Sequence, residues 1–328
     1  MIRFGIIGAG RIAKVHARST SQHPHAQLVA ISDPVEEARE ALAQEYGVKA
    51  VADAADIFND PEIDAVIVCS PTPLHIEHIV AGVKAGKAVL CEKPIAMEVE
   101  AAEGIRAQLE GEDARVMLGF NRRFDPNFAK IHTVAQAGEL GPVEQVTIIS
   151  RDPAAPSKDY IKVSGGIFKD MTIHDFDMAR FFLGDIATVS ATGQNLEEDL
   201  KDTGDFDAAV IVLTNRDGKV ATIINNRHCA TGYDQRLEVS GPEGSAFAEN
   251  VRPTTVRVSK REHSDALDPY LDFFLERYEA AYYNELDAFI EAVNGQRDFT
   301  PGIEDGIVAL KIAQAADESA RSGKVVEL

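Results

Sequence analysis

The stretch GIIGAGRIAKVHA, residues 5–17, decides the fold class of this 328-residue chain. It continues an apolar run that begins at Ile2, and Gly8, Gly10 and Ala13 within it match the pattern G-x-G-x-x-A. The first glycine permits a tight turn from strand to helix, and the second lets the backbone approach a pyrophosphate. The small third residue keeps the helix close to the strand. The pattern therefore predicts a strand–turn–helix unit whose helix N-terminus binds the phosphates of a dinucleotide.

An acidic residue at the end of the next apolar run favours a dinucleotide site over a purely structural turn. Asp33 closes the run QLVAISD (27–33), close to the offset of roughly 20 residues expected for the acid that binds a ribose hydroxyl. A carboxylate there binds a free 2′-hydroxyl and repels a 2′-phosphate, and no Arg or Lys follows it immediately. Arg11 adds a positive charge at the helix start. We therefore expect NAD rather than NADP.

The first 120 residues alternate short apolar runs with helical stretches. Near-continuous apolar strands are typical of a parallel sheet that is covered on both faces. The helical stretches end near a glycine, where a left-handed cap costs little. The alternation predicts a βαβ series and a doubly wound sheet with right-handed crossovers. The predicted strands are IRFGIIG (2–8), QLVAISD (27–33), AVIVCS (65–70), AVLCEK (88–93) and RVMLGF (115–120).

After about residue 120, strands follow one another with turn signals between them. One helix, Ser164–Gly184, interrupts them, and two helices, Pro269–Asn294 and Ile303–Ser322, close the chain. The predicted strands are 143–152, 187–195, 207–215, 219–228, 235–241 and 244–250. We predict an α/β protein with a Rossmann domain (1–120) that binds NAD and an α+β domain (121–328) for substrate binding and oligomerisation. The second domain has an open, mostly antiparallel sheet, and its last helices could pack back on the first domain.

The composition bears on partners and location. Hydrophobic residues make up 45% of the chain, which is typical of a globular protein, and no apolar run approaches the roughly 20 residues that span a bilayer. A formal net charge of −20 argues against nucleic acid or an anionic membrane as a partner. Three cysteines and an N-terminus without a signal-peptide pattern favour the cytoplasm.

Two loops leave the predicted parallel sheet at the carboxyl ends of its strands, where ligands of open α/β sheets bind. They are CSPTP (69–73) and CEKP (91–94), and Pro94 stiffens the loop that carries Lys93. We expect both loops to point at the crevice for the nicotinamide ring. The expected cofactor-binding residues are Gly8, Gly10, Arg11, Ile12, Asp33, Ser70, Pro71, Thr72, His75, Glu92 and Lys93.

The stretch SGGIFKDMTIHDFDMARFFLG (164–184) carries a polar stripe along a helix with many apolar residues. Asp170, His174 and Asp177 follow one another at spacings of four and three, which places them on one helical face. A solvated face would explain each of them individually, but the flexible glycines just ahead favour a catalytic role. A metal site is the rival interpretation. The nine histidines show no H-E-x-x-H or paired-cysteine spacing, so we expect no metal.

The motifs GAGRIAKVHA, CSPTPLH, CEKP and DMTIHDFD occur in an order and at spacings that resemble the Gfo/Idh/MocA oxidoreductases. The resemblance covers essentially the whole chain and implies a Rossmann domain followed by an open α/β substrate domain. It also implies a homotetramer. Further motifs are most similar to the members that oxidise myo-inositol with NAD: GFNRRFDP, SRDP, SGGIFKDMTIHDFDMARF, GYDQR and RYEAAYYNE.

The resemblance implies roles for individual residues. The Lys of Glu-Lys-Pro and the Asp and His of D-x-x-x-H form the catalytic triad of the family, here Lys93, Asp170 and His174. Some relatives that oxidise inositol have Asn at the position of Asp152, so this residue departs from their pattern. The implied substrate contacts are Asn121, Arg122, Asp152, Asp177, Tyr233 and Tyr282.

Oxidation of a secondary alcohol transfers a hydride to nicotinamide and requires a proton acceptor for the hydroxyl. His174 suits that role because imidazole titrates near neutral pH, while the ammonium of Lys93 could stabilise the developing alkoxide. A neutral Lys93 that takes the proton is the alternative. The predicted reaction is oxidation of myo-inositol to 2-keto-myo-inositol. The alternatives are a scyllo-inositol or aldose dehydrogenase of the same family, a glycosidase that retains NAD, and a nucleotide sensor without turnover.

Overall fold

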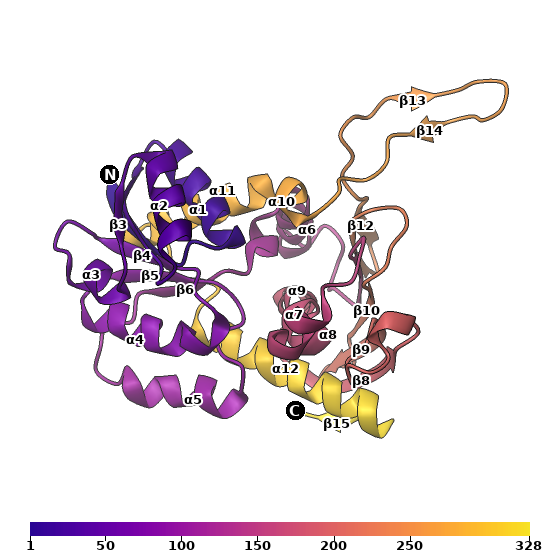
Figure 1. Cartoon of the computed structure of the whole chain (residues 1–328). Helices are drawn as coiled ribbons and strands as arrows, with labels where there is room; N and C mark the ends of the chain where they lie inside the picture. Colours follow the sequence, from indigo (N-terminus) through magenta and orange to yellow (C-terminus); the bar gives the residue numbers. More distant parts are fainter. The chain divides into compact units, whose positions relative to one another are not determined.

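The structure is a computed structural model that describes residues 1–328, apart from the side chain of Asp199 (Figure 1). None of the helices in this described part is long and apolar enough to cross a membrane. The chain divides into two compact units, each described by itself below. Unit 1 comprises Met1–Asp125 and Ala280–Leu310, and unit 2 comprises Pro126–Glu279 and Lys311–Leu328.

A six-stranded parallel sheet forms the centre of unit 1, in the order β3-β2-β1-β4-β5-β6. β2 and β3 follow on the side of β1, whereas β5 and β6 follow on the side of β4. The strand order therefore reverses between β1 and β4, and this pair is the topological switch point. The predicted doubly wound sheet is confirmed. The sequence does not predict β3, because its three residues include the exposed Lys49 and form no buried apolar run. The strands are β1 (Ile2–Ile7), β2 (Ala26–Ser32), β3 (Lys49–Val51), β4 (Ala65–Val68), β5 (Ala88–Cys91) and β6 (Val116–Leu118).

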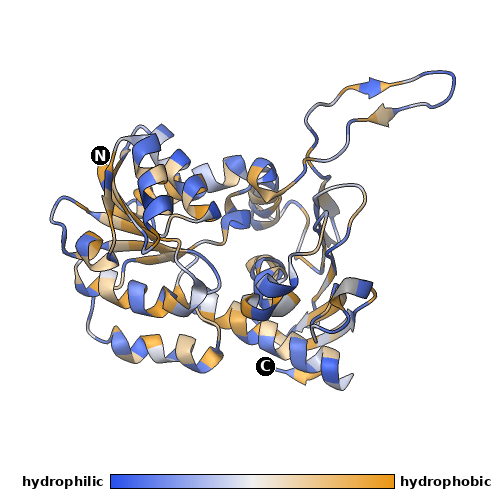
Figure 2. Ribbon diagram, viewed as in Figure 1, coloured by the Kyte–Doolittle hydropathy of each residue, from blue (hydrophilic) through white to orange (hydrophobic). Residues whose placement is uncertain are grey.

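Helices cover both faces of this sheet (Figure 1), and Figure 2 shows hydrophobic residues concentrated on its strands. On one face, α1 (Arg11–Gln22) and α2 (Glu36–Tyr46) share a hydrophobic core with α11 (Glu279–Val293). Leu286 and Phe289 of α11 lie fully buried in that core, so a late segment of the chain completes the unit. The remaining helices of unit 1 are α3 (Ala54–Asn59), η1 (Thr72–Leu74), α4 (His75–Lys84), α5 (Val99–Gln108) and η2 (Asn121–Phe124).

A seven-stranded sheet forms the centre of unit 2, in the order β12-β11-β7-β10-β9-β8-β15. Its neighbouring strands are antiparallel except for β7 and β10, which are parallel. The predicted open, mostly antiparallel sheet is confirmed, with all six predicted strands present. The strands are β7 (Gln145–Arg151), β8 (Ile186–Gln194), β9 (Ala208–Asn215), β10 (Val220–Asn226), β11 (Asp234–Gly241), β12 (Gly244–Ala248) and β15 (Val326–Glu327).

The two faces of the seven-stranded sheet differ in burial. On β9, Ile211 and Leu213 are completely buried, whereas the alternate residues Val210 and Val212 are 45% and 37% exposed. Phe247 of β12 is also exposed. Since successive side chains of a strand point to opposite faces, the sheet buries one face and leaves apolar side chains open on the other.

The predicted single helix Ser164–Gly184 is wrong, because the segment is divided between two shorter helices and a third helix ends at its first residue. They are α7 (Lys158–Ser164), α8 (Gly166–Asp170) and α9 (Ile173–Leu183). Gly165 ends α7 with a φ of +82°, a left-handed conformation that interrupts a right-handed helix. At the second break, the N–H of Thr172 donates to the carbonyl of Ile167 at 2.9 Å instead of continuing the regular pattern. Asp170 and His174 therefore lie on different helices.

The last helices also differ in part from expectation. The predicted helix Pro269–Asn294 begins only at Phe274 and is broken at Tyr278, because the first residues instead belong to an extended segment. The predicted helix Ile303–Ser322 is confirmed as α12. The other elements of unit 2 are α6 (Pro126–Gln136), η3 (Glu198–Leu200), α10 (Phe274–Arg277) and the hairpin strands β13 (Arg257–Val258) and β14 (Ala266–Leu267).

Candidate active site

The glycine-rich turn of unit 1 has the geometry that its sequence predicts. Gly8 has a φ of +102°, and a Cβ there would lie 2.6 Å from the carbonyl oxygen of Cys69. A Cβ at Gly10, in contrast, would meet nothing within 4 Å, so the space in front of the turn is open. Gly10 is the N-cap of α1, whose first turn carries no acidic residue and receives no side-chain cap. The open space and the uncapped N–H groups fit the pyrophosphate of a dinucleotide.

Asp33 lies just past β2 with its carboxylate fixed by the backbone. One carboxylate oxygen accepts a hydrogen bond from the N–H of Ala9 at 2.8 Å, and the other accepts from the N–H of Val35 at 2.8 Å. This places the acid beside the glycine-rich turn with lone pairs left for a ribose hydroxyl. Arg39, which the sequence analysis missed, lies within 3.4 Å of the carbonyl oxygen of Asp33. In the sequence, only the presence of a basic residue on α2, the helix after β2, indicates this position of Arg39.

The loops after β4 and β5 are joined by a buried histidine. Nδ1 of His75 lies 2.7 Å from the carbonyl oxygen of Pro94, and its Nε2 lies 2.9 Å from that of Ser70. Burial lowers the pKa of His75, an effect larger than that of the two carbonyl contacts, which raise it. The buried His75 therefore joins the two loops predicted to face the nicotinamide.

Glu92 belongs to a buried polar cluster that the sequence analysis missed. Its Oε1 lies 2.8 Å from Nε2 of His16 on α1, and its Oε2 accepts from the N–H of Lys93 at 3.3 Å. Gly119 makes room for it, because a Cβ there would lie 3.1 Å from Oε2. Glu92 thus links the backbone of Lys93 to the helix that follows the glycine-rich turn.

Glu285 of α11 completes this cluster. It is fully buried, and neither of its carboxylate oxygens has a hydrogen-bond partner among the described residues. Burial, and secondly the charge of Glu92, raise the pKa of Glu285 well above the ordinary value of 4.5. The signal in the sequence is a Glu on the apolar face of a helix, between Tyr282 and Phe289 at spacings of three and four.

In unit 2, Asp170 lies at the end of α8 and is held from two sides. Its Oδ1 accepts from the hydroxyl of Tyr160 at 3.0 Å, and its Oδ2 lies 3.4 Å from Nη2 of Arg227. Arg227 is 1% exposed and also donates to Asp205 at 2.6 Å. The sequence analysis missed Arg227, which follows β10 and is distant from Asp170 in sequence.

His174 occupies the first turn of α9, and a buried network anchors that turn to β10. The hydroxyl of Thr172 donates to Oδ1 of Asn225 at 2.7 Å, and Nδ2 of Asn225 donates to Asp175 at 2.8 Å. His174 is half-buried and Asp177, one turn later, is 1% exposed. The network holds the helix that carries the imidazole against the sheet.

The structure brings several predicted residues of unit 2 to one end of its sheet. The N–H of Asp152, after β7, donates to the carbonyl of Asn226 at the end of the parallel strand β10 at 2.8 Å. Arg227 links that strand end to Asp170. Tyr233, 5% exposed, precedes β11, whose first residue pairs with the last residue of β7. These elements therefore bring Asp152, Asp170 and Tyr233 to the same end of the sheet.

Three predicted substrate residues belong to unit 1. Asn121 and Arg122 lie in η2, directly after β6, and are 2% and 4% exposed. Tyr282 lies on α11 with its ring edge-on to His16 at 5.6 Å. The structure thus places Asn121 and Arg122 near the carboxyl end of β6, and it places Tyr282 beside His16 of the cluster of Glu92.

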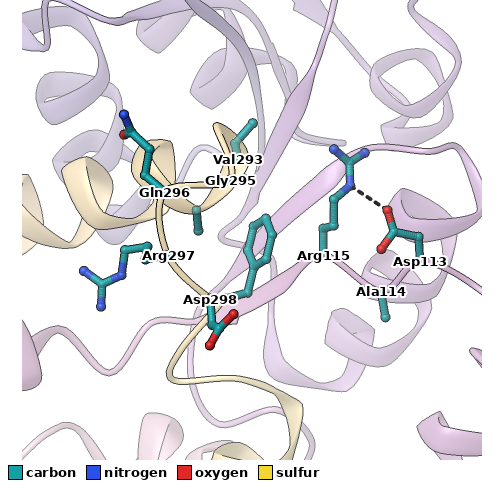
Figure 3. A pocket seen from close by; sticks show the side chains of 10 residues that line it. Asp113, Ala114, Arg115, Val293, Gly295, Gln296, Arg297 and Asp298 are labelled. Carbon is teal, nitrogen blue, oxygen red and sulfur yellow. Dashed lines mark ion pairs between the residues drawn. The ribbon is translucent and has the colours of Figure 1, made fainter.

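A pocket of about 640 Å³ lies elsewhere in unit 1, beside the amino end of β6 (Figure 3). Arg115 and Asp113 form an ion pair of 3.5 Å on its wall, and Phe299 also lines it. Ligands of open α/β sheets bind at the opposite, carboxyl end of the strands. This pocket contains none of the predicted site residues. No group of three or more metal-ligating side chains occurs among the residues that were described.

Comparison with known proteins gives consistent results along the whole chain. Residues 2–120 match the model of an oxidoreductase family with an NAD-binding Rossmann fold (GFO_IDH_MocA), and residues 135–328 match the C-terminal alpha/beta domain of the same family. The chain is 42% identical to an inositol 2-dehydrogenase of Rhizobium meliloti (strain 1021), covering 100% of this chain and 99% of the relative.

Solved structures agree with this similarity. A myo-inositol dehydrogenase from Corynebacterium glutamicum ATCC 13032 has a TM-score of 0.97 and 45% identity, covering 100% of this chain and 99% of the other. A scyllo-inositol dehydrogenase from Lactobacillus casei, crystallised with NAD(H) and scyllo-inositol, has a TM-score of 0.92 and 30% identity, covering 100% and 99%.

Proposed function

The chain belongs to the Gfo/Idh/MocA oxidoreductase family, and from this we propose that it oxidises myo-inositol to 2-keto-myo-inositol (scyllo-inosose) with NAD as hydride acceptor. The observation that carries the proposal is the full-length similarity, at 42% identity, to an inositol 2-dehydrogenase. The chain also contains the complete set of Lys93, Asp170 and His174 that the family uses.

In this proposal the two domains divide the work. Residues 1–120 bind NAD through the glycine-rich turn and Asp33, whose positions fit a pyrophosphate and a ribose. Residues 121–328 bind the substrate and form the oligomer. Residues 280–310 lie within this second range but belong to unit 1, so they support the NAD-binding domain.

NAD, when bound, supplies the hydride acceptor at nicotinamide C4. His174 accepts the proton of the reacting hydroxyl, and Asp170 favours the imidazolium that results because its carboxylate carries the opposite charge. Lys93 donates a hydrogen bond to the same oxygen and stabilises the developing alkoxide. Tyr160 and Arg227 keep the carboxylate of Asp170 in one orientation, which supports this assignment.

The polyol requires several hydrogen-bonding partners, since buried polar groups left unpaired are costly. We assign this role to the predicted substrate residues, which are all at most partly exposed: Asn121, Arg122, Asp152, Asp177, Tyr233 and Tyr282. Such a set distinguishes isomers of inositol by the positions of their axial and equatorial hydroxyls, because a misplaced hydroxyl leaves a partner unsatisfied.

The test is a panel of myo-, scyllo- and chiro-inositol and glucose, each assayed with NAD and with NADP. Highest kcat/KM for myo-inositol with NAD, and equimolar NADH and ketone, is the expected result. A preference for scyllo-inositol or glucose would reassign the substrate within the family. Product from a glycoside without net NADH would favour an NAD-retaining hydrolase, and binding without turnover would favour a nucleotide sensor.

We further propose that the enzyme is a cytoplasmic homotetramer. The three cysteines are free, and Cys69 and Cys91 are buried, which suits a reducing compartment. The open face of the seven-stranded sheet, with Val210, Val212 and Phe247, offers an apolar surface that a second copy could cover.

A further inference from the structure

The buried cluster of His16, Glu92 and Glu285 has no role in the reaction proposed above. It lies within unit 1, under the loops that follow β4 and β5. The glycine-rich turn after β1 holds the pyrophosphate and Asp33 after β2 marks the adenosine half of the site, so the nicotinamide half lies towards β4 and β5. The cluster is therefore on the nicotinamide side of the sheet.

A fully buried carboxyl group without a partner is costly in its charged form. Glu285 has no hydrogen-bond partner among the described residues, and Glu92 on the neighbouring loop places a second acid close to it. The other titratable groups near it are His16 and Cys69. His16 on α1 contacts Glu92, and Cys69 directly follows β4. Burial raises the pKa of the Cys69 thiol well above 9.0. Because no described group donates a hydrogen bond to Glu285, burial favours the neutral form of this acid.

Oxidised and reduced NAD differ by one positive charge, which resides on the nicotinamide ring. A positive charge near an acid favours its ionised form. We propose that Glu285 couples the redox state of the bound cofactor to proton release: binding of NAD⁺, but not of NADH, causes its carboxyl group to lose a proton. The O–H bond of the carboxyl breaks, the electron pair stays on the carboxylate, and the proton leaves to solvent. This inference rests on NAD binding alone and not on the identity of the polyol.

Isothermal titration calorimetry of the cofactor-free full chain tests the proposal without turnover. NAD⁺ and NADH are each titrated in buffers of different ionisation enthalpy, and the slope gives the protons released per subunit. We expect up to one proton for NAD⁺ and close to none for NADH. The Kd of NAD⁺ should then fall up to tenfold per pH unit over the range of release, while the Kd of NADH stays constant.

Glu285→Gln should abolish the release and flatten the pH dependence of the NAD⁺ Kd. Glu291→Gln is the matched control, because Glu291 lies on the same helix with a partly exposed side chain paired to Arg297. Glu291→Gln should behave like the wild type.

Equal proton release for NAD⁺ and NADH, or undiminished release in Glu285→Gln, would overturn the proposal. If Glu285→Gln does not fold, the proton release of the wild type with NAD⁺ and with NADH still tests the proposal. Proton release without oxidation of any inositol would refute only the proposed substrate.

Discussion

Asp33 is held by the N–H groups of Ala9 and Val35, so its carboxylate stays at the position proposed for the ribose of the cofactor. Asp33→Ser should weaken NAD binding by about tenfold, because a hydrogen bond to a charged group contributes about 1.5–3 kcal/mol. The same change should improve NADP binding, since the repulsion of the 2′-phosphate is removed. Kd values for both cofactors check this. Adding Arg39→Ala should cancel the gain for NADP, because Arg39 is the cation that lies nearby.

Lys93 follows β5 on the loop tied down by His75 and Glu92. Lys93→Ala should reduce kcat by about 10²-fold or more, since the donor to the developing alkoxide is lost. NAD affinity should remain nearly unchanged because the pyrophosphate and ribose contacts lie elsewhere. Single-turnover rates and direct cofactor titration measure the two quantities separately. A loss of affinity as large as the loss of rate would contradict the assigned role.

Glu285 gives the stability of the protein a pH dependence of known sign. Its pKa is raised in the folded state, so between the ordinary value of 4.5 and the raised value the folded state binds more protons than the unfolded state. The free energy of unfolding therefore falls as the pH rises through this range, by at most about 1.4 kcal/mol per pH unit. Urea unfolding across pH should show this slope in the wild type and lack it in Glu285→Gln. An identical slope in both proteins would argue against it.

At the scale of elements, the break between α7 and α8 shapes the environment of Asp170. Gly166 has a φ of +83°, and a Cβ there would lie 2.7 Å from Oδ1 of Asp205. Asp205 in turn binds Arg227, which contacts Asp170. Gly166, for which the sequence predicts only flexibility, thus leaves room for Asp205. Asp205 in turn holds the buried Arg227 beside Asp170, the predicted catalytic acid.

Gly166→Ala should therefore reduce both stability and kcat. A left-handed alanine costs about 1–2 kcal/mol, and displacement of Asp205 should add to this. Gly47→Ala is the control, because Gly47 is left-handed, with a φ of +66° and a ψ of +35°, but a Cβ there would meet nothing within 4 Å. It should lose only the backbone contribution and retain kcat. Urea unfolding and steady-state kinetics distinguish the two, and equal effects of both changes would refute the role of Asp205.

At the scale of the whole molecule, the open face of the seven-stranded sheet is the surface proposed for the homotetramer. Val212→Lys places a charge on this face, where a second copy would bury it, and should reduce the tetramer to smaller species. Light scattering coupled to size-exclusion chromatography measures the mass. Val35→Lys is the control, because Val35 is an exposed residue of unit 1. A tetramer that survives Val212→Lys would place the interface elsewhere.

The sequence by itself determined the parallel sheet, the strands of the antiparallel sheet and the glycine-rich turn. These are local patterns: the apolar alternation, the turn residues and the positive φ of Gly8 are all encoded within a few neighbouring positions. The residue types proposed for catalysis were also predictable, because they occur in short motifs. The single helix Ser164–Gly184 was not, since its breaks involve the left-handed Gly165 and the hydrogen bond from the N–H of Thr172 to Ile167.

Only the tertiary structure decided which distant residues meet. Glu285 joins Glu92 because α11, from the end of the chain, packs in the core of the first unit. Arg227 reaches Asp170 because β10 lies parallel to β7 and ends beside α8. Burial of a charged group has no local signature, since it depends on elements far apart in the sequence. For that reason the sequence predicted the motifs of the site, whereas the partners that set their charge and orientation emerged only from the fold.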